Sequence, residues 1–307
     1  MGTSVGPLVS ICIPTYNDAR LITGALRSAL VQSYDNIEIW VLDNHSDDDT
    51  ERVVGGVAAG DLRVRYMRHT ENIGMARNFS ACISLAKGEF VQILCADDAL
   101  EPGCTAALAD ALTRHPECVL AACGRILTDE SFRPIRTARA RRRREVVPGR
   151  VLLRECFVYA NRIGEPTAVM FRRDAAARGF HPDYRQAVDL EMWMHLLTRG
   201  AAVLLPEALC RIRQHAGQTS HENVRSGKVV EDKRRLFQDY GVALSPELTI
   251  AEKMIWDGRM AVTVCRTRKA GHEVRPEGVA EVFFPRLFSR LTYPVASVLW
   301  RLFGRDT

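Results

Sequence analysis

Residues 8–17, with the sequence LVSICIPTYN, begin as a short run of mainly apolar and β-branched residues and end in polar ones. Such a run is typical of a buried strand, and the Pro-Thr-Tyr-Asn that ends the segment is typical of the loop at a strand's carboxyl end. Apolar side chains then recur at helical spacing over residues 21–30, which predicts a helix with one apolar face. A strand, a loop and a helix in this order make the first half of a βαβ unit.

The same alternation continues through the first half of the chain. Four further strands are predicted, at 37–42 (IEIWVL), 63–67 (RVRYM), 90–94 (FVQIL) and 119–124 (VLAACG). Two further helices are predicted, one over 75–88 that Gly88 stops and one over 102–116 that prolines flank. Strands that alternate with helices indicate an α/β fold with a mostly parallel sheet.

The pattern changes after residue 125. The stretch IRTARARRRREVVPGR, residues 135–150, is dense in arginine and is predicted to be a long loop outside the core. A strand at 167–173, a helix at 187–200 and an extended return at 201–215 follow it. Beyond about residue 222 the pattern is helical and amphipathic, without a further βαβ signal.

The composition indicates a globular protein. The chain has 307 residues, of which 47% are hydrophobic and 26% are charged, so it can form one large domain with an appendage, or two modest domains. Its first residues carry no early Lys or Arg and no long apolar run, so no export signal is expected. The nine cysteines include no Cys-x-x-Cys pair and lie mostly within apolar runs, which favours reduced thiols over disulfides or a zinc site. We therefore expect a cytoplasmic protein.

The net charge of +5 is unevenly distributed, with much of the excess in residues 135–150 and in the arginines of the C-terminal tail. Such an excess indicates an anionic partner, and the alternative is a solvated loop. No recognised nucleic-acid motif accompanies the arginines, so nucleic acid is not expected as the partner. The longest apolar run in the tail, residues 283–307, is too short to span a bilayer. It is expected either to lie as an amphipathic helix on the inner face of an anionic membrane, or to pack on the protein itself or on a second subunit of a homodimer.

Polar residues directly after the predicted strands are the first candidates for chemistry, because ligands bind outside the carboxyl ends of strands in open parallel sheets. The segments are PTYND after the first strand, DNHSDDDT after the second and CADD after the fourth. Each one alone is compatible with ordinary turns and helix caps. Asp97 and Asp98, however, are adjacent carboxylates that repel each other unless a cation or water relieves them, so this pair needs a physical reason.

The segments VSICIPTYN, IEIWVLDNHSDDDT, ENIGMARNFS, FVQILCADD, AVDLEMWMHLLTRG and RIRQHAGQTS occur in this order over residues 8–220. Together they resemble the motifs of family 2 glycosyltransferases of the GT-A fold. The resemblance implies a Rossmann-like, mostly parallel sheet flanked by helices. It implies a nucleotide-sugar-binding and catalytic domain over residues 1–221, and the remainder, residues 222–307, is then a helical C-terminal extension.

The resemblance implies which residues hold the nucleotide of a nucleotide-sugar donor. The residues after the first strand wrap the nucleotide, Asp43 hydrogen-bonds its base, and the segment with Gly74 and Asn78 continues the pocket. The implied donor-binding residues are Pro14, Thr15, Tyr16, Asn17, Asp43, Asn72, Arg77 and Asp97.

The resemblance also implies a metal. Asp97 matches an acid that binds the ribose, and Asp98 matches an acid that binds the donor's diphosphate through a divalent cation. His215, with Arg213, matches residues that approach the metal and the diphosphate. We expect Mg²⁺ or Mn²⁺, which carboxylates and phosphate oxygens bind and which neutralises the leaving diphosphate. Cys95 stands where many members have a further acid, and its soft thiol is not counted as a ligand.

Asp189, at the start of the predicted helix that contains Trp193, matches the family's general base. Such a base takes the proton of the acceptor hydroxyl as it attacks. One base opposite the leaving group predicts a single displacement with inversion at the anomeric carbon. Two alternatives stay open: Asp189 is a helix N-cap, or the nearby Glu191 is the functional acid.

The sequence thus predicts a metal-dependent, inverting glycosyltransferase, with hexosyl transfer as the first expectation. It would move a sugar from a UDP- or dTDP-sugar to a hydroxyl of a polysaccharide or lipid-linked acceptor in cell-envelope assembly. The alternative is a catalytically impaired nucleotide-sugar-binding or scaffold protein, because Cys95 replaces an acid. A nucleotidyltransferase would also hold a nucleotide and a metal, but no Gly-rich, Lys-bearing phosphate loop follows the first strand.

Overall fold

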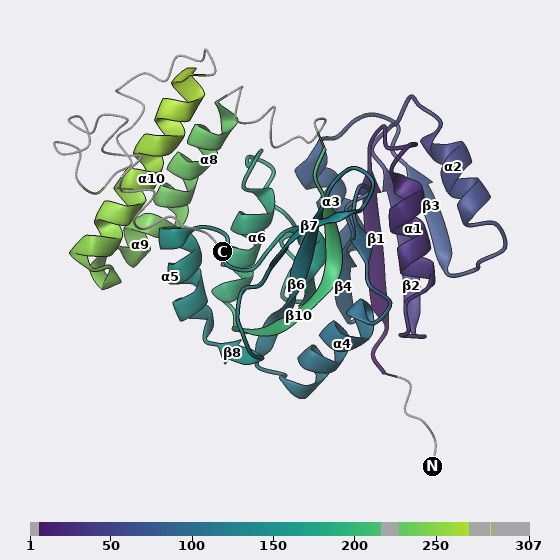
Figure 1. Cartoon of the computed structure of the whole chain (residues 1–307), viewed down its shortest axis with the longest axis horizontal. Coiled ribbons are helices and arrows are strands. Elements are labelled where there is room, and N and C mark those ends of the chain that lie inside the picture. The colour runs from purple at the N-terminus through teal and green to yellow at the C-terminus, as the bar shows by residue number, and fades with distance from the viewer. Residues whose placement is uncertain (1–5, 216–226, 270–282, 284–307) are drawn as a thin grey trace.

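A computed structural model of the chain describes residues 6–215, 227–269 and 283. Its centre is a ten-stranded sheet with helices on both faces (Figure 1). The strands lie in the order β3-β2-β1-β4-β9-β6-β10-β5, while β7 pairs with β6 and β8 pairs with β10. They are β1 (Val9–Thr15), β2 (Ile37–Asp43), β3 (Val64–Arg68), β4 (Phe90–Ile93), β5 (Ala99–Leu100), β6 (Cys118–Thr128), β7 (Pro134–Ala138), β8 (Glu145–Val147), β9 (Val169–Arg172) and β10 (Ala201–Arg213).

Most of these strands run in the same direction. Strands β3, β2, β1 and β4 pair in parallel. Strand β9 is antiparallel to both β4 and β6, so β6 and its parallel partner β10 point the same way as β4. The mostly parallel α/β sheet expected from the sequence is therefore confirmed. Because they are parallel, β1, β2 and β4 bring their carboxyl ends to one edge of the sheet.

Two clusters of buried side chains lie between the sheet and its helices. In β1, Ile11 and Ile13 belong to the cluster under α1 and α4, and Cys12 belongs to the cluster under α3, α5 and α6. Successive residues of a strand point to opposite faces, so an unbroken apolar run is what a strand covered on both faces requires. The helices of the described residues are α1 (Ile22–Leu30), α2 (Thr50–Val57), α3 (Met75–Leu85), α4 (Cys104–Arg114), α5 (Gly149–Tyr159), α6 (Val188–Leu197), α8 (Lys228–Leu236), α9 (Val242–Leu244) and α10 (Ile250–Lys269).

The predicted strands and helices of the first half are confirmed, with ends that shift by a few residues. Helix α3 ends at Leu85, three residues before Gly88, so Gly88 does not form its end. That glycine has a different role, because a Cβ there would lie 2.6 Å from the backbone nitrogen of Ser10 and 2.7 Å from the carbonyl oxygen of Leu8. The turn into β4 can approach β1 this closely only without a side chain. All nine cysteines are free, as expected.

The prediction of a long loop over residues 135–150 is wrong. Strand β7 pairs with β6 and strand β8 pairs with β10, both in antiparallel fashion, and α5 begins at Gly149. The sequence does not reveal these strands because each buries a single residue, Ala138 in β7 and Val147 in β8. An edge strand that buries one residue has no alternating apolar pattern, and the surrounding arginines hide what remains.

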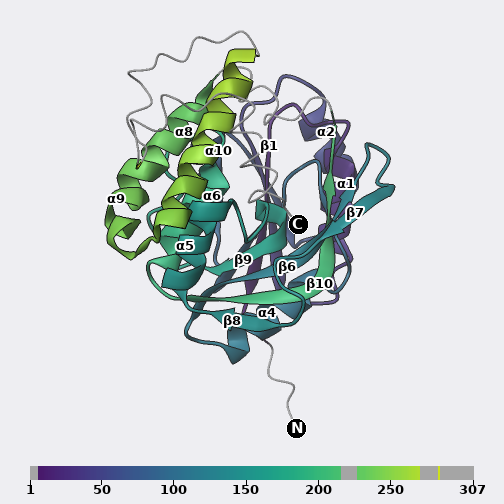
Figure 2. The same ribbon diagram turned by 60° about the vertical axis from the view of Figure 1, so that its left-hand side comes forward.

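The helical extension packs directly on the α/β part of the chain. Trp256 of α10 stacks on Phe157 of α5, with the ring centroids 4.0 Å apart and the planes 7° from parallel. On the same two helices, Arg154 forms a two-armed ion pair with Glu252, at 2.9 and 2.6 Å. Figure 2 shows α8, α9 and α10 beside α5 and α6. The extension therefore shares a hydrophobic core with a face of the sheet through Leu236, Leu244, Leu248 and Trp256. Val230, Met260 and Val264 form a small cluster of their own between α8 and α10.

Two expectations about the second half fall on parts of the chain outside the described residues. They are the division between residues 221 and 222, and the membrane-interfacial or subunit-packing role of the tail, of which Phe283 alone is described. Within the described residues, none of the helices combines the length and the apolar character that crossing a membrane requires.

We expect Trp256→Ala to lower the free energy of unfolding by about 3–5 kcal/mol, because it leaves a cavity between α10 and α5. Urea denaturation followed by circular dichroism measures the loss. Val242→Ala in α9, where the side chain is 63% exposed, is the control and should change stability by less than about 0.5 kcal/mol. An early, separate transition of the extension that leaves the rest of the protein as stable as before would contradict a shared core.

Candidate active site

A cleft of about 690 Å³ opens at the carboxyl ends of β1 and β4. Its walls come from the loops after β1, β2 and β4, from the start of α3, and from the residues after β10. Most of the predicted donor-binding residues line it, namely Pro14, Thr15, Tyr16, Asn17, Asn72 and Asp97, together with His215. Motifs that lie up to 200 residues apart in the sequence thus meet at one place.

Hydrogen bonds join the loops after β1 and β2. The backbone N–H of Asn17 donates to the Ser46 hydroxyl at 2.9 Å, and the Asn17 side-chain oxygen accepts the N–H of Asp47 at 2.9 Å. Asn17 has a φ of 57°, in the left-handed region that asparagine tolerates better than most residues. The loop that faces the cleft is therefore held in a conformation that its own sequence favours.

Asp43, at the end of β2, lies beneath the cleft and does not line it. Its side chain is fully buried, and its two oxygens accept hydrogen bonds from the Ser46 N–H at 2.7 Å and the Tyr66 hydroxyl at 2.6 Å. Burial, followed by the Asp43 carboxylate, raises the pKa of Tyr66, so this hydroxyl stays a donor. The next residue, Asn44, does line the cleft, and its amide donates to the Asn72 side-chain oxygen at 2.9 Å.

Helix α3 brings one of its two predicted polar residues to the cleft. Asn78 lines the cleft and is held by His69, whose Nε2 lies 3.0 Å from the Asn78 side-chain oxygen, and by the carbonyl oxygen of Leu42 at 3.1 Å. Arg77 is exposed on α3 and is not part of the cleft wall. In this structure Asn44, which the sequence reasoning missed, occupies a position on the cleft that Asp43 does not.

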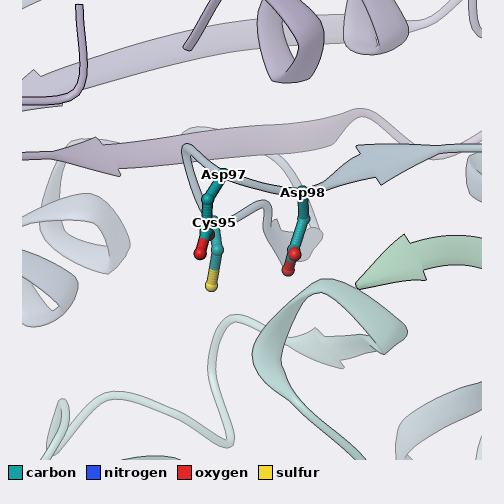
Figure 3. Close-up of side chains that lie close together, drawn as sticks. All are labelled: Cys95, Asp97 and Asp98. Atoms are coloured by element: carbon teal, nitrogen blue, oxygen red, sulfur yellow. The ribbon is translucent and has the colours of Figure 1, made fainter. Parts of the chain in front are cut away.

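The adjacent acids after β4 lie in different surroundings. Asp97 faces the cleft, and its carboxylate lies 3.1 Å from His215 Nε2. Asp98 is buried, and it accepts the hydroxyl of Thr167 at 2.5 Å and the backbone N–H of Arg213 at 3.0 Å. Figure 3 shows the side chains of Cys95, Asp97 and Asp98 directed to the same side of their loop. One potential ligand atom from each of these three residues lies within 4.8 Å of the others.

The electrostatics of this cluster favour a bound cation. Burial, followed by the charge of Asp97, raises the pKa of Asp98 well above its usual range, against the hydrogen bonds from Thr167 and Arg213. Burial and the two carboxylates raise the pKa of the Cys95 thiol in the same way. A divalent cation would relieve this repulsion. Carboxylate oxygens suit Mg²⁺ or Mn²⁺, so Asp97 and Asp98 fit the expected metal, and His215 lies beside them on Asp97.

A second cavity, of about 440 Å³, contains Asp189 in its wall. Asp189 is the second residue of α6, and its carboxylate accepts the Leu190 N–H at 2.7 Å and the Asn161 amide at 3.3 Å. Burial raises the pKa of Asp189 to about 7, the Leu190 N–H opposes this, and the nearby Glu165 adds to it. A carboxylate with a pKa near neutrality is suited to take up a proton at physiological pH.

The turn that leads into α6 is held by another acid. Asp232 of α8 accepts backbone N–H groups of Arg185, Gln186 and Ala187, at 2.9, 2.5 and 2.7 Å from its Oδ2. Asp189 lies inside the helix and is not the residue that caps it, so the alternative interpretation of Asp189 as an N-cap is wrong. The acid that holds this turn comes from the extension, a partner that the sequence around α6 does not indicate.

Glu191, the other acid of α6, is buried away from both cavities. Its carboxylate forms a two-armed ion pair with Arg178, at 2.8 and 2.7 Å, and accepts the Tyr240 hydroxyl at 2.7 Å. Such a carboxylate is fully engaged in holding α6 in place. Arg213 ends β10 and lies with its guanidinium 3.8 Å from the centre of the Phe132 ring.

Comparisons with known proteins agree with this geometry. A family model described as glycosyl transferase family 2 matches residues 10–180. An uncharacterized protein of Mycobacterium tuberculosis is 33% identical over 263 residues, which cover 81% of each chain. Two longer relatives match over 13% and 16% of their own length.

Two solved structures share the fold. S. aureus TarS residues 1–349 in complex with UDP-GlcNAc has a TM-score of 0.59 at 18% identity, over 97% of this chain and 92% of that chain. The mannosyltransferase PcManGT from Pyrobaculum calidifontis, in complex with GDP-Man and Mn²⁺, has a TM-score of 0.58 at 20% identity, over 96% of this chain and 79% of that chain. At these identities the likeness shows the fold alone, which is the GT-A fold expected from the sequence.

We expect Asp189→Asn to stabilise the protein more at about pH 8 than at about pH 5. Because the fold raises the pKa of Asp189 from 3.8 to about 7, its ionisation opposes folding. This cost is absent below about pH 4, grows as the pH rises toward 7 and is complete above it. At about 1.4 kcal/mol per pKa unit its upper limit is about 4 kcal/mol, which partial exposure to water reduces.

Denaturation by urea at the two pH values measures the difference between variant and wild type. Asp183→Asn, in the exposed segment before α6, is the matched control and should give the same small change at both pH values. An Asp189→Asn variant whose stability differs from wild type equally at both pH values would show that Asp189 titrates as an ordinary carboxyl.

Proposed function

Because this chain belongs to glycosyl transferase family 2, we propose that it is a metal-dependent, inverting glycosyltransferase. Its donor would be a UDP- or dTDP-hexose, and its acceptor a hydroxyl of a polysaccharide or lipid-linked glycan of the cell envelope. The observation that carries this proposal is the arrangement of three acids: Asp97 in the wall of the nucleotide-sized cleft, Asp98 buried next to it, and Asp189 in the wall of a second cavity.

The cleft supports nucleotide binding through polar side chains held in place by the fold. Asn17, Asn44 and Asn72 present amides to it from three different loops, and each is fixed by hydrogen bonds to a neighbouring loop or side chain. Amides and backbone groups of this kind bind a base and a ribose without adding net charge. Asp97 would accept a ribose hydroxyl. Asp43 lies beneath the cleft wall and accepts the Ser46 N–H. It would therefore position the loop after β2 and would not contact the base directly.

The acids after β4 would hold the metal, for which Mg²⁺ and Mn²⁺ both fit the ligand type, and His215 beside them is the further candidate ligand. When bound, such a cation neutralises charge on the departing diphosphate. Of the two acids, Asp98 is the more firmly held ligand, because Thr167 and the Arg213 N–H each donate a hydrogen bond to its carboxylate. His215 would orient Asp97, to which it is already hydrogen-bonded. Cys95 remains a thiol here and would leave the ligation to oxygen and imidazole.

Asp189 would act as the general base. It accepts the proton of the acceptor hydroxyl while that oxygen forms its bond to the anomeric carbon. The bond from this carbon to the diphosphate oxygen breaks, and the electron pair leaves with the nucleoside diphosphate. Attack on the face opposite the leaving group inverts the anomeric carbon. Asp189 is favoured over Glu191 because Asp189 lines a cavity, whereas Glu191 is bound on both oxygens by Arg178 and Tyr240.

We expect Asp189→Asn to lower the transfer rate by about 10²- to 10⁴-fold, because the amide cannot accept the proton. Binding of the donor nucleotide should be unchanged, since Asp189 does not line the nucleotide cleft. Release of UDP or dTDP from a panel of nucleotide-sugars, with membrane extract as the acceptor source, measures the rate, and calorimetry measures UDP binding. Asp183→Asn is the control. A rate near that of wild type in Asp189→Asn would remove this residue as the base.

We expect Asp98→Asn to abolish the dependence of UDP binding on Mg²⁺ or Mn²⁺. The variant loses the charge of the fixed ligand and keeps its shape. Calorimetric titration with UDP in Mg²⁺, Mn²⁺ or EDTA compares it with wild type and with Asp110→Asn, a surface control on α4. Turnover that survives both EDTA and Asp98→Asn would contradict a metal. Nucleotide binding without turnover in the wild type, with every donor and extract, would favour the nucleotide-sugar-binding or scaffold protein.

A further inference from the structure

The cavity beside Asp189 extends from the α/β domain to the C-terminal helices. Its wall near the base includes Asn161 and Glu165, and its wall on the other side includes Lys233 of α8 and Arg259 of α10. Figures 1 and 2 show α8 and α10 beside α5 and α6, so the cavity lies where the two parts of the chain meet. A volume of about 440 Å³ falls within the range of pockets that hold small ligands.

The ammonium of Lys233 is the unusual group of this cavity. It donates hydrogen bonds to the Arg259 carbonyl oxygen at 3.2 Å and to the Thr263 hydroxyl at 2.5 Å, which leaves one of its three N–H groups available. Within residues 6–215, 227–269 and 283, no carboxylate forms an ion pair with it. The acid next to it in the sequence, Asp232, also lines the cavity, but its carboxylate accepts the backbone N–H groups of the turn before α6.

The surroundings of Lys233 carry positive charge. Burial, followed by the guanidinium groups of Arg259 and Arg266, lowers the pKa of Lys233 well below its usual range. Buried cations in proteins are normally paired with an anion. Lys233 lines the cavity with two positive neighbours and no ion-paired acid among the described residues. Its surroundings favour the neutral amine, so an anion bound beside it would stabilise its ammonium form.

We propose that this cavity is the acceptor pocket and that it takes a hydroxylated acceptor bearing an anionic group, either a phosphate or a carboxylate. The anionic group would lie at Lys233 and Arg259, and the reacting hydroxyl at Asp189. The proposal rests on the proposed function for the role of Asp189. It adds the charge of the acceptor and assigns its recognition to the helical extension.

The cationic groups on one wall and the Asp189 carboxylate on the other also determine which end of the acceptor meets the base. Phosphate at the cationic wall is held away from Asp189, whose carboxylate would repel it, so the neutral end of the acceptor meets the base. A neutral acceptor would have no such preference. The pocket thus selects both the kind of acceptor and the end that reacts.

The test compares three probes that differ in charge: glucose, glucose 6-phosphate and glucuronate. Calorimetry with the full chain, with and without UDP and Mg²⁺, should show that at least one anionic probe binds about tenfold or more tightly than glucose. Preference for glucose 6-phosphate assigns a phosphate-bearing acceptor, and preference for glucuronate assigns a carboxylate-bearing one. Equal binding of all three probes, or no binding of either anionic probe, would overturn the proposal.

Lys233→Met should remove the preference for the anionic probe, and Lys233→Arg should retain it. Lys228→Met, the same change at the start of the same helix, is the matched control and should behave as wild type. Thermal melting verifies that each variant is folded. Retention of the full preference in a folded Lys233→Met variant would contradict the assignment. UDP binding in the same samples reports on the proposed function separately: intact UDP binding without an anion preference refutes this inference alone.

Discussion

The buried carboxylate of Asp98 joins three parts of the chain that lie far apart in the sequence. It follows β4, it accepts the hydroxyl of Thr167 just before β9, and it accepts the N–H of Arg213 at the end of β10. These contacts fix the loop after β4 against its neighbours at the edge where the parallel strands end. The cost is a negative charge inside the protein, which the raised pKa of Asp98 records. The benefit is that Asp97 is held with its carboxylate toward the cleft and His215.

The other acid of the site is supported from the opposite side, by the extension. The carboxylate of Asp232 accepts the N–H groups of residues 185–187, which form the turn that leads into α6. Asp189 lies just beyond this turn, so its position depends on how α8 packs against the turn. The Phe157–Trp256 stack fixes α10 against α5, which packs on α6. The extension is therefore part of the frame that holds Asp189.

The sequence predicts those parts of this architecture whose signals are local. Strands covered on both faces, such as β1 and β2, show mostly apolar runs that Ser10 and Glu38 alone interrupt before the strand ends, whereas β7 and β8 bury one residue each and leave no pattern. The order of the motifs identifies Asp97, Asp98 and Asp189, but it does not identify their partners. Thr167 and Asp232 lie in segments without a motif, and they reach the site through the pairing of β9 with β4 and the packing of α8 on α6. Such long-range contacts have no signature within a single stretch of sequence.

The presence of Cys95 where many members of the family have an acid can be understood from the distribution of charge around it. Transfer of a sugar needs one region that receives a departing diphosphate and another that receives a proton, and acids serve both. Burial raises the pKa of the Cys95 thiol, and the charges of Asp98, Asp97 and Asp189 raise it further. It therefore stays neutral, where an aspartate would add a third carboxylate to a pair that already repels. The thiol lowers the negative charge at this edge of the sheet, so less repulsion has to be offset before a diphosphate can approach. Under the proposed function, a cation held by Asp98 and its neighbours would then suffice for the cleft, and the Asp189 carboxylate would take the proton in the next cavity.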